Sequence, residues 1–61
     1  MKVLKIEYLS STDTLIELVS EPFHSSGSFL LIVLSDYRKQ FRFDCILEAT
    51  KEFKKQLKLH R

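Results

Sequence analysis

Apolar and polar side chains alternate along much of the first 44 residues, in short runs separated by turn-forming residues. Alternation with a period of two is typical of strands that bury one face. Turn compositions fall at 10–13, 21–28 and 35–40. The pattern predicts four strands, at Val3 to Leu9, Thr14 to Ser20, Ser28 to Ser35 and Gln40 to Asp44. Because the connections are short, consecutive strands should pair as antiparallel hairpins.

The third strand contains six consecutive apolar residues. Since neighbouring side chains of a strand point to opposite faces, both faces of this strand are apolar and both need cover. The two sets are Phe29, Leu31 and Val33 on one face, and Leu30, Ile32 and Leu34 on the other. A chain of 61 residues can supply one such cover. We therefore expect a second molecule to supply the other.

The C-terminal segment has the period of an amphipathic helix. Its apolar stripe is Ile46, Ala49, Phe53 and Leu57. Asp44 can cap a helix that begins at Cys45. Alternatively, Thr50 caps a shorter helix, because Cys45 and Leu47 would extend the strand face of Phe41 and Phe43. We prefer the longer helix.

These elements predict a single domain over 1–61 with an α+β fold, a four-stranded antiparallel meander with one C-terminal helix on one face (ββββα). The helix should pack on Leu4, Ile6, Ile16, Leu18, Phe41 and Phe43. It should also meet the set that begins at Phe29, whose aromatic ring can pack near Phe41 and Phe43. The far face should keep Val3, Leu9, Leu15 and Val19 with the set that begins at Leu30.

Size and composition favour association. A chain of this length buries only about 60% of its unfolded surface, so it usually needs a disulfide, a metal or a partner. The single cysteine, Cys45, excludes an internal disulfide, and neither His24 nor His60 lies at zinc-site spacing from it. We expect no cofactor and no metal. The lack of a long apolar segment or leader, together with one unpaired thiol, favours a cytoplasmic protein.

No residue set indicates catalysis. The spacing of Cys45 from His24 and His60 supports no thiol–imidazole pair, and its apolar neighbours suggest a small buried side chain. The segment 25–28 lacks the lysine and the following helix of a phosphate-binding loop. Phe23, in a polar loop, is either a core plug or an exposed anchor for a partner. We expect a protein that is not an enzyme.

Charge is distributed unevenly. Residues 6–37 contain five acids and no Lys or Arg, whereas residues 38–61 contain eight bases and three acids. These bases are candidates for contact with phosphates: Arg38, Lys39, Arg42, Lys51, Lys54, Lys55, Lys58 and Arg61. The alternative explanation is an ordinary solvated helix face, with lysines late in the helix where the dipole favours them.

The first functional hypothesis is therefore a small protein–protein interaction module. It would form a homo-oligomer, most simply a dimer, or bind and regulate or inhibit a protein target, through the apolar sheet face or a strand edge. The candidate interface residues are Leu15, Val19, Phe23, Leu30, Ile32 and Leu34. Weak nucleic-acid binding through the basic residues is the alternative. Nothing in the sequence indicates a membrane or a small-molecule substrate.

Overall fold

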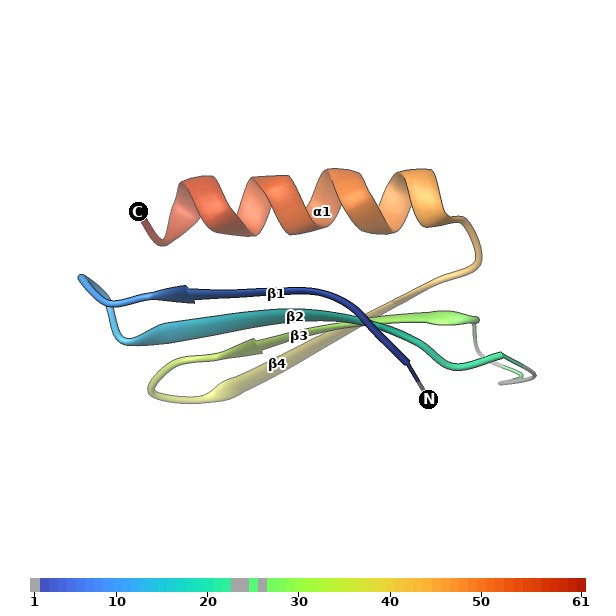
Figure 1. The fold of residues 1–61 in the computed structure, drawn as a ribbon, viewed down its shortest axis with the longest axis horizontal. Helices are drawn as coiled ribbons and strands as arrows, with labels where there is room; N and C mark the ends of the chain where they lie inside the picture. Colours follow the sequence, from blue (N-terminus) through green and yellow to red (C-terminus); the bar gives the residue numbers. More distant parts are fainter. Residues whose placement is uncertain (1, 23–24, 26) are drawn as a thin grey trace.

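The computed structural model describes residues 2–22, 25 and 27–61. It contains the strands β1 (Lys2–Leu9), β2 (Thr14–Ser20), β3 (Phe29–Leu34) and β4 (Arg38–Phe43), followed by the helix α1 (Ile46–Leu59) (Figure 1). The strands form one antiparallel sheet in the order β1-β2-β3-β4. The predicted ββββα meander is therefore confirmed.

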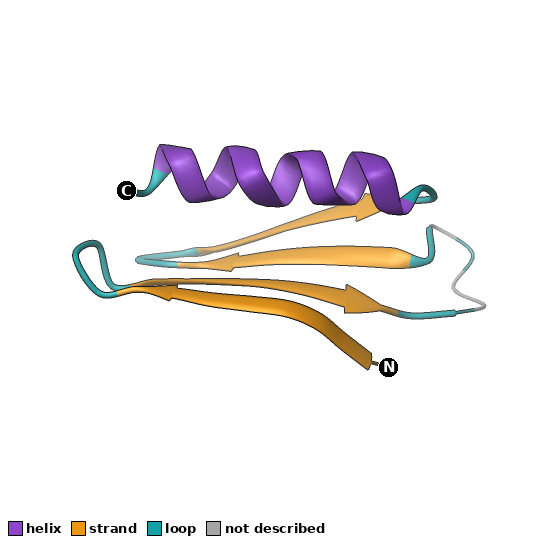
Figure 2. Cartoon of the chain, turned by 45° about the horizontal axis from the view of Figure 1, so that its top comes forward, coloured by secondary structure: helices purple, strands orange, loops and turns teal. Residues whose placement is uncertain are grey.

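The helix covers only part of one sheet face. Its backbone lies close to β2, β3 and β4, and β1 lies outside this cover. The helix lies closest to β2 and β3, and Figure 2 draws β1 as the strand farthest from it. The N-terminal end of β1 bends away from α1 (Figures 1 and 2) but stays paired with β2. One edge strand of the sheet thus lies beyond the helix backbone, and reaches α1 only through side chains such as Lys5, whose Nζ lies 5.8 Å from the centroid of the Phe53 ring.

The hydrophobic core lies between α1 and the strands. It is formed by Ile16, Leu18, Leu31, Val33, Ala49 and Phe53. Around it pack the half-buried side chains of Leu9, Phe29, Phe41, Phe43 and Leu57. The set Phe29, Leu31 and Val33 therefore faces the helix, as the aromatic-packing argument predicts. Burial of each large aliphatic chain stabilises the fold by about 1.5–3 kcal/mol.

The prediction for the faces of β1 is right for Val3, which lies opposite Val19 on the face without the helix, but wrong for Leu4, Ile6 and Leu9. The β1–β2 register pairs Leu9 with Thr14 across the connecting turn, and Thr14 lies on the helix side with Ile16. Leu9 therefore packs against the helix-side core and not on the far face. Tyr8 and Ile6, opposite Leu15 and Glu17, point to the face without a helix.

Leu4 also fails to join the predicted core. A register shift lies between Val3 and Lys5, so Leu4 is an extra residue without a partner in β2. Such a bulge bends the strand and increases its local twist. Leu4 remains exposed, because α1 does not reach over β1. The apolar residues of β1 thus contribute little to the core.

The helix begins near the earlier of its two predicted starts. Its N-cap is Cys45, in an extended conformation and without a side-chain capping bond, so Asp44 is not the cap. Cys45 is exposed, which contradicts its predicted burial. Cys45 lies in the short connection between the end of β4 and the first turn of α1.

The buried stripe of α1 is rotated relative to the prediction. Ala49, Phe53 and Gln56 are buried, whereas Ile46 is 41% exposed. Spacings of four and three residues keep these buried side chains on one stripe, and Ile46 lies at its border. Gln56 tolerates burial because its Nε2 donates to Oε2 of Glu52 at 2.7 Å. The stripe therefore includes a polar residue that hydrophobicity alone did not select.

Candidate functional site

The sheet face opposite α1, here called the open face, is organised in three cross-strand rows. The rows follow from the registers of the four strands. They are Tyr8–Leu15–Leu34–Arg38, Ile6–Glu17–Ile32–Gln40 and Val3–Val19–Leu30–Arg42. Strands β1, β2 and β3 contribute mainly apolar side chains to this face, and β4 contributes two arginines and a glutamine. The open face is therefore an apolar surface with a basic border.

The candidate interface residues from the sequence all belong to this face where the structure describes them. Leu34 is 40% exposed, and Leu15 and Ile32 are half-buried. Val19 and Leu30 are only 0% and 5% exposed, so they offer almost no surface to a partner. Phe23 lies outside the described residues. The accessible apolar part of the face is therefore shifted toward β1.

Arg42 forms the polar end of the row that contains Val19 and Leu30. Its Nη1 lies 2.9 Å from Oε1 of Glu21 and donates to the carbonyl oxygen of Gly27 at 3.5 Å. Because Arg42 lies directly opposite Leu30, its aliphatic stem can shield that side chain while the guanidinium stays at the surface. This ion pair helps to close one end of the open face.

The candidate interface residues chosen from the sequence include none from β1, although β1 contributes the most exposed apolar side chains of the open face. Ile6 and Tyr8 are 56% and 57% exposed, and Val3 and Leu4 are also exposed. The length of the turn between β1 and β2 could have indicated which side chains of β1 lie on the open face. Four residues, Ser10–Asp13, separate Leu9 from Thr14, so pairing these two places Tyr8 on the face of Leu15. A continuous apolar strip therefore runs from β1 across to Leu15 and Leu34.

Tyr8 is held in place at one end of this strip. Its hydroxyl donates to Oδ1 of Asp13 at 2.6 Å. This hydrogen bond, the negative charge of Asp13 and desolvation raise the pKa of the Tyr8 phenol above 10.0. Asp13 has a φ of 48°, a left-handed conformation that aspartate tolerates in turns. The turn thus fixes the direction of an exposed aromatic ring.

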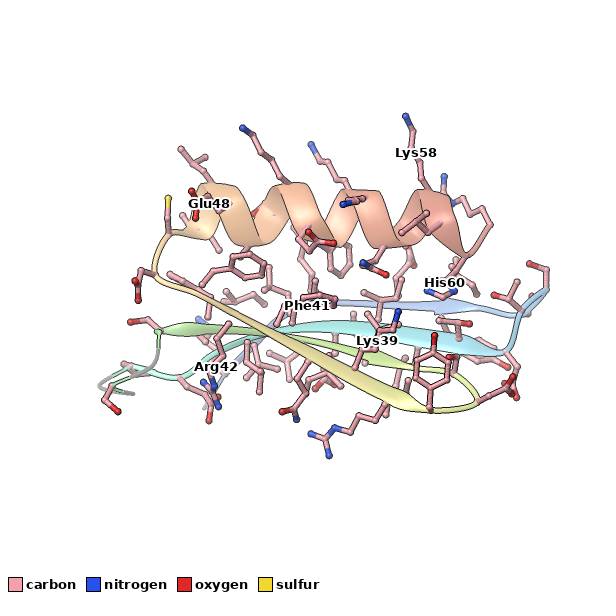
Figure 3. All side chains as sticks on the ribbon, turned by 180° about the vertical axis from the view of Figure 1, so that it is seen from behind. Lys39, Phe41, Arg42, Glu48, Lys58 and His60 are labelled. Atoms are coloured by element: carbon pink, nitrogen blue, oxygen red, sulfur yellow. The ribbon has the colours of Figure 1, made fainter. Side chains whose placement is uncertain are left out.

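The basic residues do not form one surface. Arg38 and Arg42 are on the open face, whereas Lys39 occupies the row of Ile16 and Val33 on the helix side. Figure 3 shows Arg42 on one side of the sheet and Lys58 on the far side of the helix. The exposed residues Lys51, Lys54, Lys55 and Lys58 lie away from the buried stripe of α1. Arg61 is exposed just beyond the helix.

The described residues contain no arrangement for metal or thiol chemistry. No group of three or more His, Cys, Asp or Glu side chains in them could hold a metal ion. Cys45 precedes α1 and His60 follows it, so the 14 residues of the helix separate them by about 21 Å. His24 lies outside the described residues. Among these same residues, no helix has the length and apolar character needed to span a membrane.

Comparison with known proteins identifies no relative: no family model, curated protein or solved structure matches this chain. The candidate site therefore rests on the geometry of the chain itself.

Proposed function

We propose that this chain is a non-enzymatic protein–protein interaction module that associates through the open face and the adjoining β1. The observation that carries the proposal is the accessible apolar strip of Val3, Ile6, Tyr8, Leu15, Ile32 and Leu34. The helix covers the other face of the sheet, so this strip has no layer over it in the described part of the chain. A second copy is the occupant we favour, which would make the protein a dimer in the cytoplasm.

Energetics support a partner for this surface. A domain of this size has a total stability of only about 5–15 kcal/mol. Contiguous apolar surface on a soluble protein is a common mark of an interaction site. The polar border of Arg38, Gln40 and Arg42 beside an apolar centre is the usual anatomy of an interface. Binding and regulation of a different protein target would use the same surface.

Weak nucleic-acid binding is the second candidate, supported by the exposed lysines of α1. Lys51, Lys54, Lys55 and Lys58 share the outward side of one helix, where they could follow a phosphate backbone. The separation of Arg38 and Arg42 from these lysines weakens this candidate. Retention on DNA or heparin that is lost at moderate salt would support it, whereas association that persists in high salt supports the protein interface.

Two neighbouring residues of β3 allow a direct test. Ile32 is half-buried on the open face opposite Glu17, so Ile32→Lys gains an acidic neighbour and should leave the monomer folded. Leu31 is fully buried beneath α1, so Leu31→Lys should unfold the chain, because a buried unpaired charge costs several kcal/mol. Circular dichroism and light scattering should show a folded Ile32→Lys protein with weakened association.

The matched control is Leu47→Lys. Leu47 is an exposed apolar residue of α1, away from the open face, and the substitution adds the same charge. This variant should associate like the wild type. The proposal is wrong if Ile32→Lys is folded and associates as strongly as Leu47→Lys. Unfolding of both β3 variants would also contradict it, because the open face would then be internal to one chain.

A further inference from the structure

The outer edge of β1 is the longest free strand edge of the sheet. β1 spans 8 residues and β4, at the opposite edge, spans 6. In the described residues, no strand pairs with the outer side of β1. A free edge presents unpaired N–H and C=O groups and acts as a template for another strand, unless charge or shape prevents pairing.

The side chains of β1 divide into two chemically different sides. Lys5 and Glu7 lie on the helix side, opposite Leu18 and Ile16. Ile6 and Tyr8 lie on the open face. The acid and the base are therefore two residues apart on one side of an edge strand. A single inward-facing lysine would discourage strand pairing, but here an acid of opposite charge accompanies it.

We propose that β1 pairs with β1 of a second copy as an antiparallel ladder centred on Ile6. This inference rests on the proposed interaction function and specifies how two copies join. In this register, Ile6 faces Ile6 of the second copy on the open face. Lys5 faces Glu7 of the second copy, and Glu7 faces its Lys5. The two-fold symmetry thus forms two cross-strand pairs of opposite charge, each favourable for strand pairing.

Neighbouring registers are excluded by the same charges. A shift of the centre by one residue, to Lys5 or to Glu7, keeps every side chain on its own face of the joined sheet, so these two registers are the nearest alternatives. Centring the ladder on Glu7 would place Glu7 opposite Glu7 of the second copy. Centring it on Lys5 would place two lysines together. Only the register centred on Ile6 gives each charge a partner of opposite sign, so β1 is complementary to itself in one alignment.

The opposite edge of the sheet lacks this property. β4 carries Arg38, Lys39 and Arg42 and no acid. In an antiparallel ladder of two β4 strands, no base would therefore have an acid as a partner, and basic side chains are a common way to protect an edge from pairing. With one edge self-complementary and the other repulsive, strand pairing should stop at two copies and not continue into a filament.

The position of α1 fits such a dimer. The helix backbone does not reach over β1, although Lys5 Nζ lies 5.8 Å from the centroid of the Phe53 ring, so two paired β1 strands would leave a gap between the two helices. The Lys5 and Glu7 pairs would line this gap, where water can reach them. On the other side, the exposed Ile6 and Tyr8 chains of both copies would join the two open faces into one apolar surface, which edge pairing leaves free for a face-to-face contact through Ile32. Because the ladder is centred on Ile6, the bulge at Leu4 limits its regular part to residues 5–7 of each copy.

Charge reversal tests this register. Lys5→Glu makes the helix side of β1 wholly acidic, and Glu7→Lys makes it wholly basic. Each variant alone should dimerise at least about tenfold more weakly than the wild type, because both cross-strand pairs become repulsive. An equimolar mixture of the two variants should restore a dimer, because each acid then faces a base. Lys58→Glu, an equal charge change on the outer side of α1, should have no effect.

Sedimentation velocity of the single variants and the mixture, with circular dichroism as a folding check, gives the result. Recovery in the mixture supports the register, since damaged folding could not be repaired by mixing. Failure of the mixture to dimerise more strongly than its components overturns it. If the wild type is dimeric and only Ile32→Lys weakens the dimer, the edge inference fails while the proposed function stands. If every protein, wild type included, is monomeric, both fail.

Discussion

Gly27 lies so close to Phe43 that a Cβ atom on the glycine would be 2.9 Å from the Phe43 carbonyl oxygen. Its φ is 132°, in a region that side-chain-bearing residues rarely adopt. This contact joins the loop after β2 to the end of β4. The carbonyl of Gly27 also accepts the hydrogen bond from Arg42, so the glycine backbone helps to close one end of the open face.

Gly27→Ala should therefore destabilise the fold. The strained backbone conformation alone costs about 1–3 kcal/mol, and the contact with the Phe43 backbone adds to this because backbone cannot rotate away. Ser25→Ala, at an exposed position of the same loop, should change the free energy of unfolding by less than about 0.5 kcal/mol. Urea unfolding of both variants measures the difference. Equal stability of the two variants would show that the loop avoids the contact.

The phase of α1 can be tested with two adjacent residues. Phe53 is 6% exposed in the core, whereas Lys54 is exposed. Phe53→Ala should lower the free energy of unfolding by about 3–5 kcal/mol. Lys54→Ala should change it by less than about 0.5 kcal/mol. Chemical denaturation that gives similar losses for both would mean that the helix is rotated from the position described.

The Tyr8–Asp13 hydrogen bond predicts a pH dependence of stability. The folded protein favours the neutral phenol, because ionised Tyr8 could not donate to Asp13 and would lie beside its negative charge. Since the folded pKa of Tyr8 is raised, its contribution is complete below the unfolded pKa of about 10 and is lost as the pH rises through the folded value.

Tyr8→Phe isolates this contribution from the lysines that titrate in the same range. The stability difference between wild type and Tyr8→Phe should shrink as the pH is raised above about 10. Asp13→Asn should bring the pKa of Tyr8 down toward its ordinary value, as seen by ultraviolet absorbance titration. A stability difference that stays constant over this range would show that the hydrogen bond does not form in solution.

Replacing Cys45 with a better N-cap residue should stabilise the protein. Its backbone is extended, as in most N-cap residues, but its side chain makes no capping bond. Cys45→Ser supplies a hydroxyl that can accept from the first-turn N–H groups and should raise the free energy of unfolding by about 0.5–1 kcal/mol. Cys45→Ala is the control and should be near neutral, since the thiol is exposed. Marked destabilisation by alanine would indicate that the thiol is buried.

The strands could be predicted because alternation and turn composition are local properties. β2 has the predicted bounds Thr14–Ser20, and β3 lies within the predicted range 28–35. The division of β3 into a helix-facing and an open side followed from its alternation, and the aromatic ring of Phe29 indicated which side meets α1.

The faces of β1 could not be predicted from its own pattern. Leu4, Ile6 and Tyr8 make the more apolar side, which a local rule assigns to the core. The actual side is decided by the pairing of Leu9 with Thr14 and by how far α1 extends over the sheet, and both depend on the rest of the fold. For the same reason, the sequence indicated the β2 and β3 part of the candidate site but not its β1 part.

The central claim is that the open face and β1 form an association surface, and the most direct measurement is sedimentation equilibrium of the wild-type chain over a concentration series. A dimer that dissociates on dilution is the predicted result, with the dimeric mass reached below about 100 µM, equivalent to an association free energy stronger than about 5.5 kcal/mol. A single species with the 7.2 kDa mass of the monomer at every concentration, with no binding of hydrophobic dyes, would contradict the account.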